Sequence, residues 1–229
     1  MYEIQRNGRS NTEFEIVVTE RPSIPAAVFR TNEIETAERT LIEKLGGVDP
    51  ITITVSFGFF ADPDQWNNVF RNARMWLMDE TDAKLVFSDD KEWFYNVLKT
   101  NINASERTIR KFGRFDVDFM CDGYVYRVDG ESRYTVENLP KNKWLESHPE
   151  YILTGSGSAT LTVNGNQMQA TVNGTLTINT DLMIAYNQEG VPQNTLLSGN
   201  YEDLYLRRGE NEISVSGAEL EIIPHWRSL

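Results

Sequence analysis

The stretch that most constrains the fold is residues 51–60, ITITVSFGFF, in which apolar residues alternate with small or polar ones. A period of two is typical of a strand with one buried face, because successive side chains point to opposite sides of a sheet. The pattern therefore predicts a strand. Its buried face consists of Ile51, Ile53, Val55, Phe57 and Phe59.

A helix is predicted directly after this strand. Asp62 suits the cap, Pro63 suits the first helical position, and Gln65 can reach back as in a capping box. Apolar residues then recur at the three-to-four spacing of a helical stripe. They are Trp66, Val69, Phe70, Ala73, Trp76 and Leu77.

Other patterns in the first half predict further strands, and hence an α+β domain with one main helix. Residues 14–18 are rich in β-branched and aromatic side chains, and residues 85–87 and 93–97 flank a polar turn, as in a hairpin. Residues 115–119 predict a strand that ends near Cys121, whereas residues 31–47 are ambiguous. The polar joint at 129–132 predicts domains at 1–130 and 131–229.

The second half has no helical period and is rich in Gly, Thr, Asn and Ser, which predicts an all-β domain. The pairs at 164–165 and 173–174 are both Asn-Gly, the strongest local hairpin signal, and together predict a meander over 159–179. Strands are expected at 212–215 and 218–223, completing a β-sandwich. Residues 155–158, GSGS, are interpreted as a flexible turn rather than a phosphate loop, because no helix follows. The fold class is therefore mainly β.

The charge balance opposes nucleic-acid binding. The chain has 34 acidic and 22 basic side chains, for a net charge of −12. Affinity for phosphate backbones depends on Lys and Arg, so we expect no sequence-specific recognition of DNA or RNA. A channel lined by carboxylates would instead let a duplex slide past without sticking.

No feature of the sequence indicates secretion or membrane insertion. The single cysteine, Cys121, cannot form an internal disulfide, and no stretch approaches the roughly 18 apolar residues of a membrane span. The first 20 residues contain no signal-like apolar run. We therefore expect a protein made in a cytoplasm.

Candidate chemistry is weak, which predicts a protein that is not an enzyme and has no cofactor or metal. The only histidines, His148 and His225, lack a nucleophile motif around them. Cys121 has no basic neighbour and is interpreted as a core or strand-end residue. Adjacent Asp89 and Asp90 lack the alternating spacing of a calcium loop.

Aromatic residues of the second half leave an alternative open, because sugars stack on exposed rings. Most such rings fill a core or an interface instead. The candidates are Trp144, Tyr151, Tyr186, Tyr201, Tyr205 and Trp226; we take Trp144, Tyr186, Tyr201 and Tyr205 as the possible glycan-facing ones.

The order of motifs along the chain resembles the distal tail protein family of siphophages, in phages or prophages of Gram-positive bacteria. In the first half the matching segments are ERPSIP at 20–25, ITITVSF at 51–57, Arg71 and Arg74 before Trp76-Leu77, KLVFSDDKEWFYNV at 84–97, GRF at 113–115 and FMCD at 119–122. In the second they are GSG at 155–157, Asn164-Gly165, a strand ending at Asp181, GENEI at 209–213 and IPHWR at 223–227. Departures are residues 34–47, where the family has a glycine-bearing loop, and Gly123, where a proline often follows.

This resemblance implies a structural virion protein at the phage tail tip. The N-terminal domain would close into a homo-hexameric ring, and the C-terminal domain would be a galectin-like β-sandwich. The ring would join the tail tube protein to a hub adhesin or lysin and let DNA pass. Heterologous ring contacts favour unpaired edges, so we expect interface residues at Phe14, Ile16, Val18, Ile34, Leu41 and Leu45.

Two other functions compete with this interpretation. A carbohydrate-binding module would attach the phage to host cell-wall glycan, although the galectin pattern of sugar-binding residues is not visible. A wall hydrolase would need a polar pocket with a perturbed carboxylate, for which the sequence offers little support.

Overall fold

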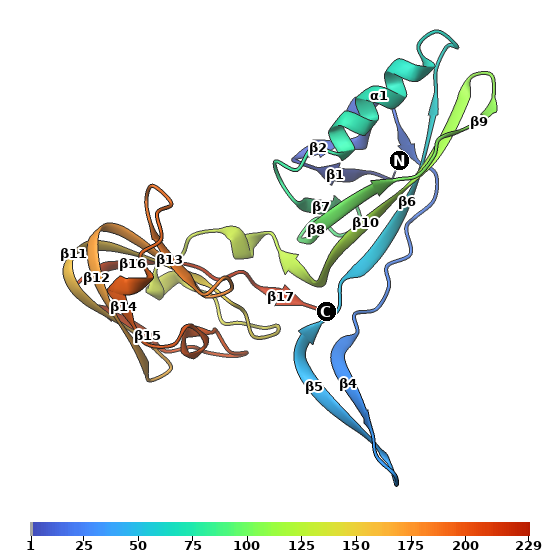
Figure 1. Ribbon diagram of the computed structural model, residues 1–229. Coiled ribbons are helices and arrows are strands. Elements are labelled where there is room, and N and C mark those ends of the chain that lie inside the picture. Colours follow the sequence, from blue (N-terminus) through green and yellow to red (C-terminus); the bar gives the residue numbers. More distant parts are fainter. Residues whose placement is uncertain (1) are drawn as a thin grey trace. The chain divides into compact units, whose positions relative to one another are not determined.

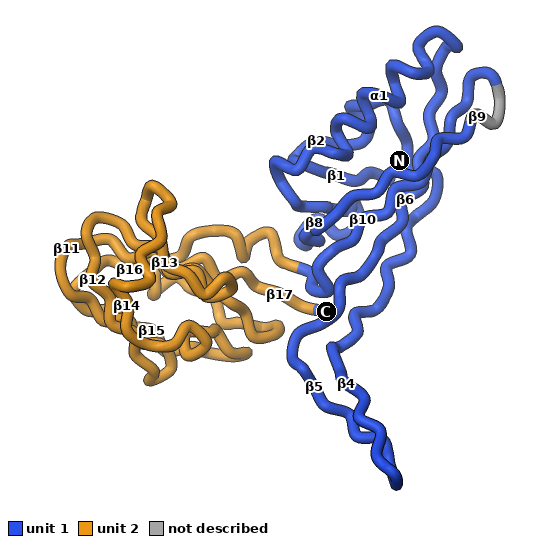
Figure 2. The backbone as a smooth tube through the Cα atoms, viewed as in Figure 1, with its two compact units in different colours: residues 1–125, 229 blue, residues 126–228 orange. Residues whose placement is uncertain are grey.

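The computed structural model describes residues 2–229, with the side chains of all of these except residues 107–109. The chain divides into two compact units, Met1–Val125 together with Leu229, and Tyr126–Ser228 (Figure 2). The division falls a few residues before the joint expected at 129–132. The roles assigned to the two domains remain predictions.

The first unit is built on an antiparallel sheet with the strand order β2-β1-β7-β8-β10-β6-β3, in which β9 also pairs with β10 (Figure 1). The expected hairpin at 85–97 is present as β7 and β8. The strands are β1 (Ile4–Arg6), β2 (Arg9–Ser10), β3 (Val17–Val18), β6 (Ile51–Phe60), β7 (Lys84–Phe87), β8 (Trp93–Ile102), β9 (Glu106–Ile109) and β10 (Phe112–Arg127).

One face of this sheet is covered by helix α1 (Trp66–Leu77) (Figure 1). The five alternating residues of β6 are all buried there, as predicted. The Phe57 ring stacks on Phe115 of β10 with centroids 5.4 Å apart, and Phe59 lies 5.1 Å from the Trp66 ring of the helix. Strand and helix thus form one aromatic core.

The helix is confirmed, but its predicted cap is wrong. Gln65 occupies the cap position and makes no side-chain cap bond. The Asp62 carboxylate accepts a hydrogen bond from Lys111 at 2.6 Å, while its backbone carbonyl accepts the N–H groups of Gln65 and Trp66. A tight turn before the helix therefore replaces the side-chain cap.

Two expected strands differ from the structure. Residues 11–14 form the 3-10 helix η1 (Asn11–Phe14), capped by Ser10 and Glu13, so only Val17–Val18 of the expected strand is extended. The capping box satisfies the backbone groups locally and outweighs the β propensity of Phe14. Strand β10 continues past Cys121 to Arg127, and its alternate burial extends only as far as Gly123.

The ambiguous region contains a β-hairpin that forms a sheet of its own, β4 (Phe29–Glu35) and β5 (Thr40–Val48), here called the arm. Figure 1 shows the arm extending away from the rest of the first unit. Every residue of its strands except Val48 is exposed.

The second unit is dominated by the long hairpin β11 (Glu150–Val163) and β12 (Asn166–Asn179), joined at Asn164-Gly165 as predicted. Both turn residues have positive φ, 51° and 87°. The remaining elements are β13 (Ile184–Asn187), β14 (Leu197–Ser198), β15 (Ile213–Ser216), β16 (Glu219–Ile223), β17 (Arg227–Ser228), and the 3-10 helices η2 (Asp129–Glu131), η3 (Val136–Asn138), η4 (Asn194–Leu196) and η5 (Tyr201–Leu204).

This hairpin contributes to both halves of the sheet. The half near Glu150 pairs with β16 and β13, and the half near Asn164 pairs with β15 and β14. Side chains of both halves share one core cluster, and the mainly-β prediction is confirmed. Between the halves, Gly157 and Gly174 have φ of 107° and 83°, which L-residues rarely adopt.

The expected turns at 155–158 and 173–174 are wrong. Both segments lie inside the hairpin, where Gly155 pairs with Gly174 and Ser156 with Asn173. A glycine with positive φ suits a turn, but it also suits an irregular position within a strand. An Asn-Gly or Gly-Ser-Gly segment alone therefore does not distinguish a turn from such a position.

Candidate functional site

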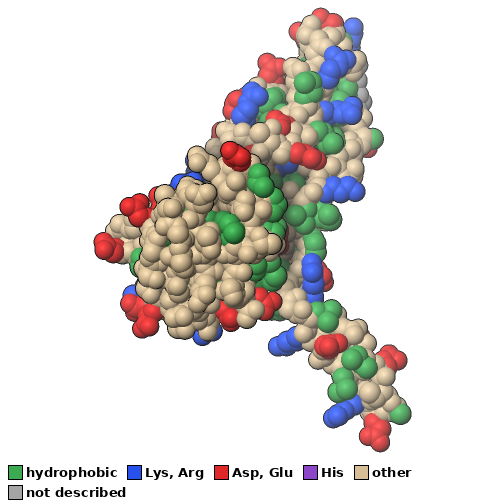
Figure 3. Space-filling view, turned by 60° about the vertical axis from the view of Figure 1, so that its left-hand side comes forward, with side chains coloured by type: hydrophobic (Ala, Val, Ile, Leu, Met, Phe, Trp, Pro, Cys, Tyr) green, Lys and Arg blue, Asp and Glu red, His purple; other side chains and the backbone are tan. Residues whose placement is uncertain are grey.

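The arm concentrates the exposed apolar surface of the described residues. Of the 17 exposed large hydrophobic side chains, five lie in its two strands, and two more, Ile24 and Val28, lie just before them. Figure 3 shows hydrophobic side chains between charged ones along the arm. Because two isolated strands are marginally stable in water, a hairpin of this kind gains stability from whatever covers it.

The register of the arm places three expected interface residues on one face. Ile34 lies directly opposite Leu41, and Leu45 is on the same side of β5 as Leu41 because it is four residues further on. Their exposed fractions are 43%, 40% and 60%. Ile34 and Leu41 are thus adjacent, and Leu45 lies beyond the hydrogen-bonded Asn32 and Glu43 pair on the same face. These three apolar residues are here called the arm stripe.

Exposed apolar residues of the arm that the sequence interpretation missed are Phe29 and Ile42, at 58% and 57%. Ile42 lies opposite Glu33, on the face away from the arm stripe. No alternation in residues 29–48 separates an apolar from a polar face, so periodicity gave no signal for them.

The other three expected interface residues pack within the first unit. Ile16 is fully buried, Val18 is 9% exposed, and the half-buried Phe14 ring stacks on Trp76 with centroids 4.7 Å apart. Asn11 supports this packing, since its side chain donates to the Ile16 carbonyl at 2.8 Å. These side chains already have partners in their own subunit, so the interface hypothesis rests on the arm.

The sheet face opposite α1 has an acidic stripe on β10. Asp116, Asp118 and Asp122 alternate with the buried core residues of that strand. On β6, Thr54 lies opposite Asp118 and its hydroxyl donates to that carboxylate at 2.7 Å. Asn103 donates to the other oxygen of Asp118 at 3.2 Å. This acidic stripe is the strongest candidate for the carboxylate-lined surface expected from the net charge.

The aromatic candidates of the second unit are all at least partly covered. Tyr151 and Trp226 are buried in its core. The Arg127 guanidinium lies 4.8 Å from the centre of the half-buried Trp144 ring. The Tyr205 ring stacks on His148 at 3.9 Å.

Tyr186 and Tyr201 are half-buried as well. Their hydroxyls donate to Glu150 at 3.5 Å and to Asn194 at 3.4 Å, respectively. The rings expected to face glycan therefore contribute to packing within the unit, and glycan contact by any of them remains a prediction.

Both histidines have structural partners. The His148 Nε2 atom accepts a hydrogen bond from the Arg227 guanidinium at 2.8 Å, because a guanidinium has only donors. Its Nδ1 atom therefore has the proton and donates to Asp181 at 2.7 Å. His225 contacts Glu131 at 2.8 Å. Each histidine thus forms hydrogen bonds with charged side chains of the second unit.

Cys121 is fully buried, as expected of a core residue, and burial raises the pKa of its thiol to about 12. Asp89 accepts from the Tyr2 hydroxyl at 3.0 Å and pairs with Arg21 at 3.8 Å. Over residues 2–229, no group of three or more His, Cys, Asp or Glu residues could hold a metal ion. No helix within the same range is long and apolar enough to cross a membrane.

Comparison with solved structures finds the same fold in the Dit protein (gp 19.1) of phage SPP1, described as a paradigm of the hub adsorption apparatus in Gram-positive-infecting phages. The TM-score is 0.69 over 97% of each chain, with 13% sequence identity. No protein-family model matches the sequence. No curated protein matches it either. The resemblance to the distal tail proteins is thus confirmed at the level of the fold.

Proposed function

We propose that this chain is a distal tail protein, a structural component of the tail tip of a phage that infects Gram-positive bacteria. The observation that supports this most strongly is the shared fold over 97% of both chains, which includes both units. A function in binding and assembly also agrees with the structural hydrogen bonds of both histidines and the buried thiol.

The proposed assembly is a ring of six copies joined through the arm. In a ring, one surface of each copy meets a different surface of the next, and a rotation closes the set. An arm that extends from its own unit suits such a contact, since its exposed apolar side chains have no cover from the strands beside them. Covering the arm stripe would then stabilise the ring.

The acidic stripe would face the DNA channel. Carboxylates at Asp116, Asp118 and Asp122 repel a phosphate backbone, so they prevent tight binding while DNA moves through. One side of the ring would bind the tail tube protein, and the other a hub adhesin or lysin. No cofactor or catalytic step is part of this proposal.

The test is the mass of the purified full chain by light scattering, with negative-stain images of the same fraction. The expected result is about six times the 26.3 kDa of one chain, with a central hole in the images. A monomer at every concentration would contradict self-assembly. Binding to host cell-wall polysaccharide would then be measured, because carbohydrate binding by the second unit is the alternative.

A further inference from the structure

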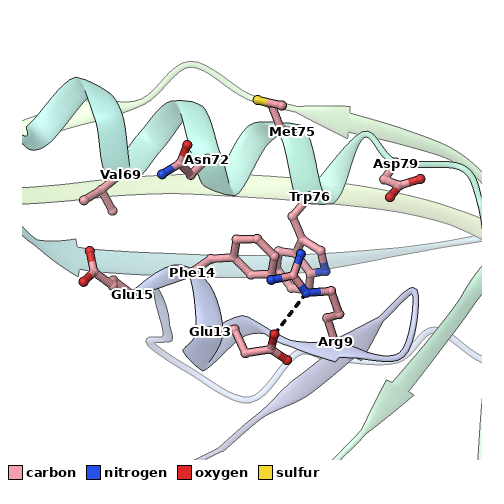
Figure 4. A pocket seen from close by; sticks show the side chains of 9 residues that line it. All are labelled: Arg9, Glu13, Phe14, Glu15, Val69, Asn72, Met75, Trp76 and Asp79. Carbon is pink, nitrogen blue, oxygen red and sulfur yellow. Dashed lines mark hydrogen bonds and ion pairs between the residues drawn. The ribbon is translucent and has the colours of Figure 1, made fainter.

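A groove of about 580 Å³ lies between η1 and α1 in the first unit, on a surface that the ring proposal does not use (Figure 4). Its apolar part consists of Phe14 from η1 and Val69, Met75 and Trp76 from α1. Figure 4 shows the Phe14 and Trp76 rings one against the other between the two elements.

The apolar part of the groove contains a ring pair held in place by its neighbours and a flexible methionine side chain. Phe14 stacks on Trp76 at an interplanar angle of 14°, and the Trp76 indole donates to the Arg6 carbonyl at 3.0 Å. Met75 is 69% exposed at the edge of the groove. A thioether side chain is flexible and polarisable, so it can adapt to a guest's apolar surface.

One cation already occupies part of the groove. The Arg9 guanidinium lies 4.4 Å from the centre of the Phe14 ring, and its Nε donates to Glu13 at 3.0 Å. This is how an arginine from another chain would be recognised, by an aromatic face together with a carboxylate. Arg9 shows that the groove accommodates such a group.

Two carboxylates remain for a guest. Glu15 and Asp79 line the groove, and neither has an ion pair within the described part of the chain. Hydrogen bonds from the Thr81 hydroxyl and backbone N–H hold the pKa of Asp79 below its ordinary value, so that this carboxylate stays charged. The groove therefore favours a cation beside its apolar part.

The geometry points to a docking site for a partner protein, through a segment that offers an arginine or lysine next to an aliphatic side chain. The aliphatic group contacts the exposed Met75 at the edge of the groove, and the cation pairs with Glu15 or Asp79. Nucleic acid is a poor occupant because its phosphates would meet these carboxylates. The arm of a second copy is also a poor fit, since residues 29–48 contain four glutamates against three basic residues.

Methyl NMR of the full chain with labelled methionines tests this site. The probe is the capped peptide Leu-Arg-Leu-Lys-Leu, with Leu-Glu-Leu-Glu-Leu as its matched control, each added up to about 10 mM because short peptides bind weakly. The methyl signal that disappears from the spectrum of the Met75→Leu variant is assigned to Met75. We expect the basic peptide alone to shift it saturably, while the signal of the buried Met168 in the second unit stays in place.

Charge variants provide the second measurement. Glu15→Gln and Asp79→Asn should each raise the Kd of the basic peptide roughly two- to fivefold, the range of an exposed ion pair. The asparagine keeps an oxygen for Thr81. Glu189→Gln, at an exposed position of the second unit, makes the same charge change away from both the groove and the arm and should leave the Kd unchanged.

The proposal is overturned if Met75 does not shift, if both peptides shift it equally, or if neither groove variant alters the Kd. Light scattering on the same samples separates this outcome from the tail-hub proposal. If the ring forms but the basic peptide does not shift the Met75 signal, only the docking site is contradicted. If the peptide binds but the protein stays monomeric, only self-assembly is contradicted.

Discussion

Replacing Ile34, Leu41 and Leu45 by serine would remove the arm stripe while leaving the arm backbone in place. If the stripe is covered by the next subunit, the replacement should prevent ring formation. The expected loss can be worked out from the exposed surface that the ring would bury.

The three side chains are 43%, 40% and 60% exposed, so together they leave roughly one and a half side chains of apolar surface uncovered. Burying a whole Leu or Ile side chain is worth about 1.5–3 kcal/mol. The triple substitution should therefore cost about 2–4 kcal/mol at each subunit interface, or roughly 30- to 1000-fold in the association constant.

Folding of the single subunit should change little, because substitutions at exposed positions usually alter stability by no more than about 0.5 kcal/mol each. Light scattering over a concentration series gives the association constant, and thermal unfolding checks the fold. A shift from hexamer to monomer with nearly the same unfolding temperature is the expected outcome.

The matched control replaces three exposed apolar residues of the second unit, Leu182, Met183 and Val191, by serine. Their exposed fractions are similar, at 63%, 43% and 47%. If the control dissociates the ring as strongly as the arm variant, or if the arm variant keeps the wild-type mass at every concentration, the reasoning about the arm is refuted.

Three further predictions concern charge and chemistry. Asp116→Lys with Asp118→Lys should leave ring assembly intact but slow DNA ejection from particles; equal ejection rates would contradict the channel role of the acidic stripe. The pKa of Asp181 is lowered chiefly by the hydrogen bond from His148, so its contribution to stability is complete above its unfolded pKa and is lost as the pH falls through the lowered one. Asp181→Asn should therefore flatten the unfolding free energy as the pH falls below about 4, the ordinary pKa of an Asp carboxyl, and an unchanged pH profile would count against this. The Cys121 thiol should resist iodoacetamide at about pH 8 until the protein unfolds, and rapid native labelling seen by mass spectrometry would contradict its burial.

Local patterns predicted the elements whose structure depends on neighbours in the sequence. The alternation in residues 51–60 and the apolar stripe from Trp66 to Leu77 each correspond to one element with the expected buried face. Asn164-Gly165 forms its turn because positive φ at two successive residues matches the twist of a hairpin. In each case the preference is encoded within about a dozen residues.

The same kind of signal failed where distant partners decided the outcome. Asn173-Gly174 is also an Asn-Gly pair, yet it lies inside a strand because Ser156 and Gly155 of β11 pair with it. Phe14 is an aromatic residue of the kind that favours strands, but the local capping box of η1 places it in a 3-10 helix, and only its stacking on Trp76 depends on a distant residue. The distant partners, β11 and Trp76, cannot be identified from the local sequence.

The order of motifs across the chain predicted the distal tail fold, which the comparison with SPP1 Dit confirmed. Only the tertiary structure decided which apolar residues are left for partners. The sequence interpretation placed both Ile16 and Ile34 at the subunit interface, but Ile16 is fully buried in its own unit and Ile34 is 43% exposed. The physical reason is that burial depends on which elements pack over a residue, and nothing packs over the arm within its own sheet of two strands.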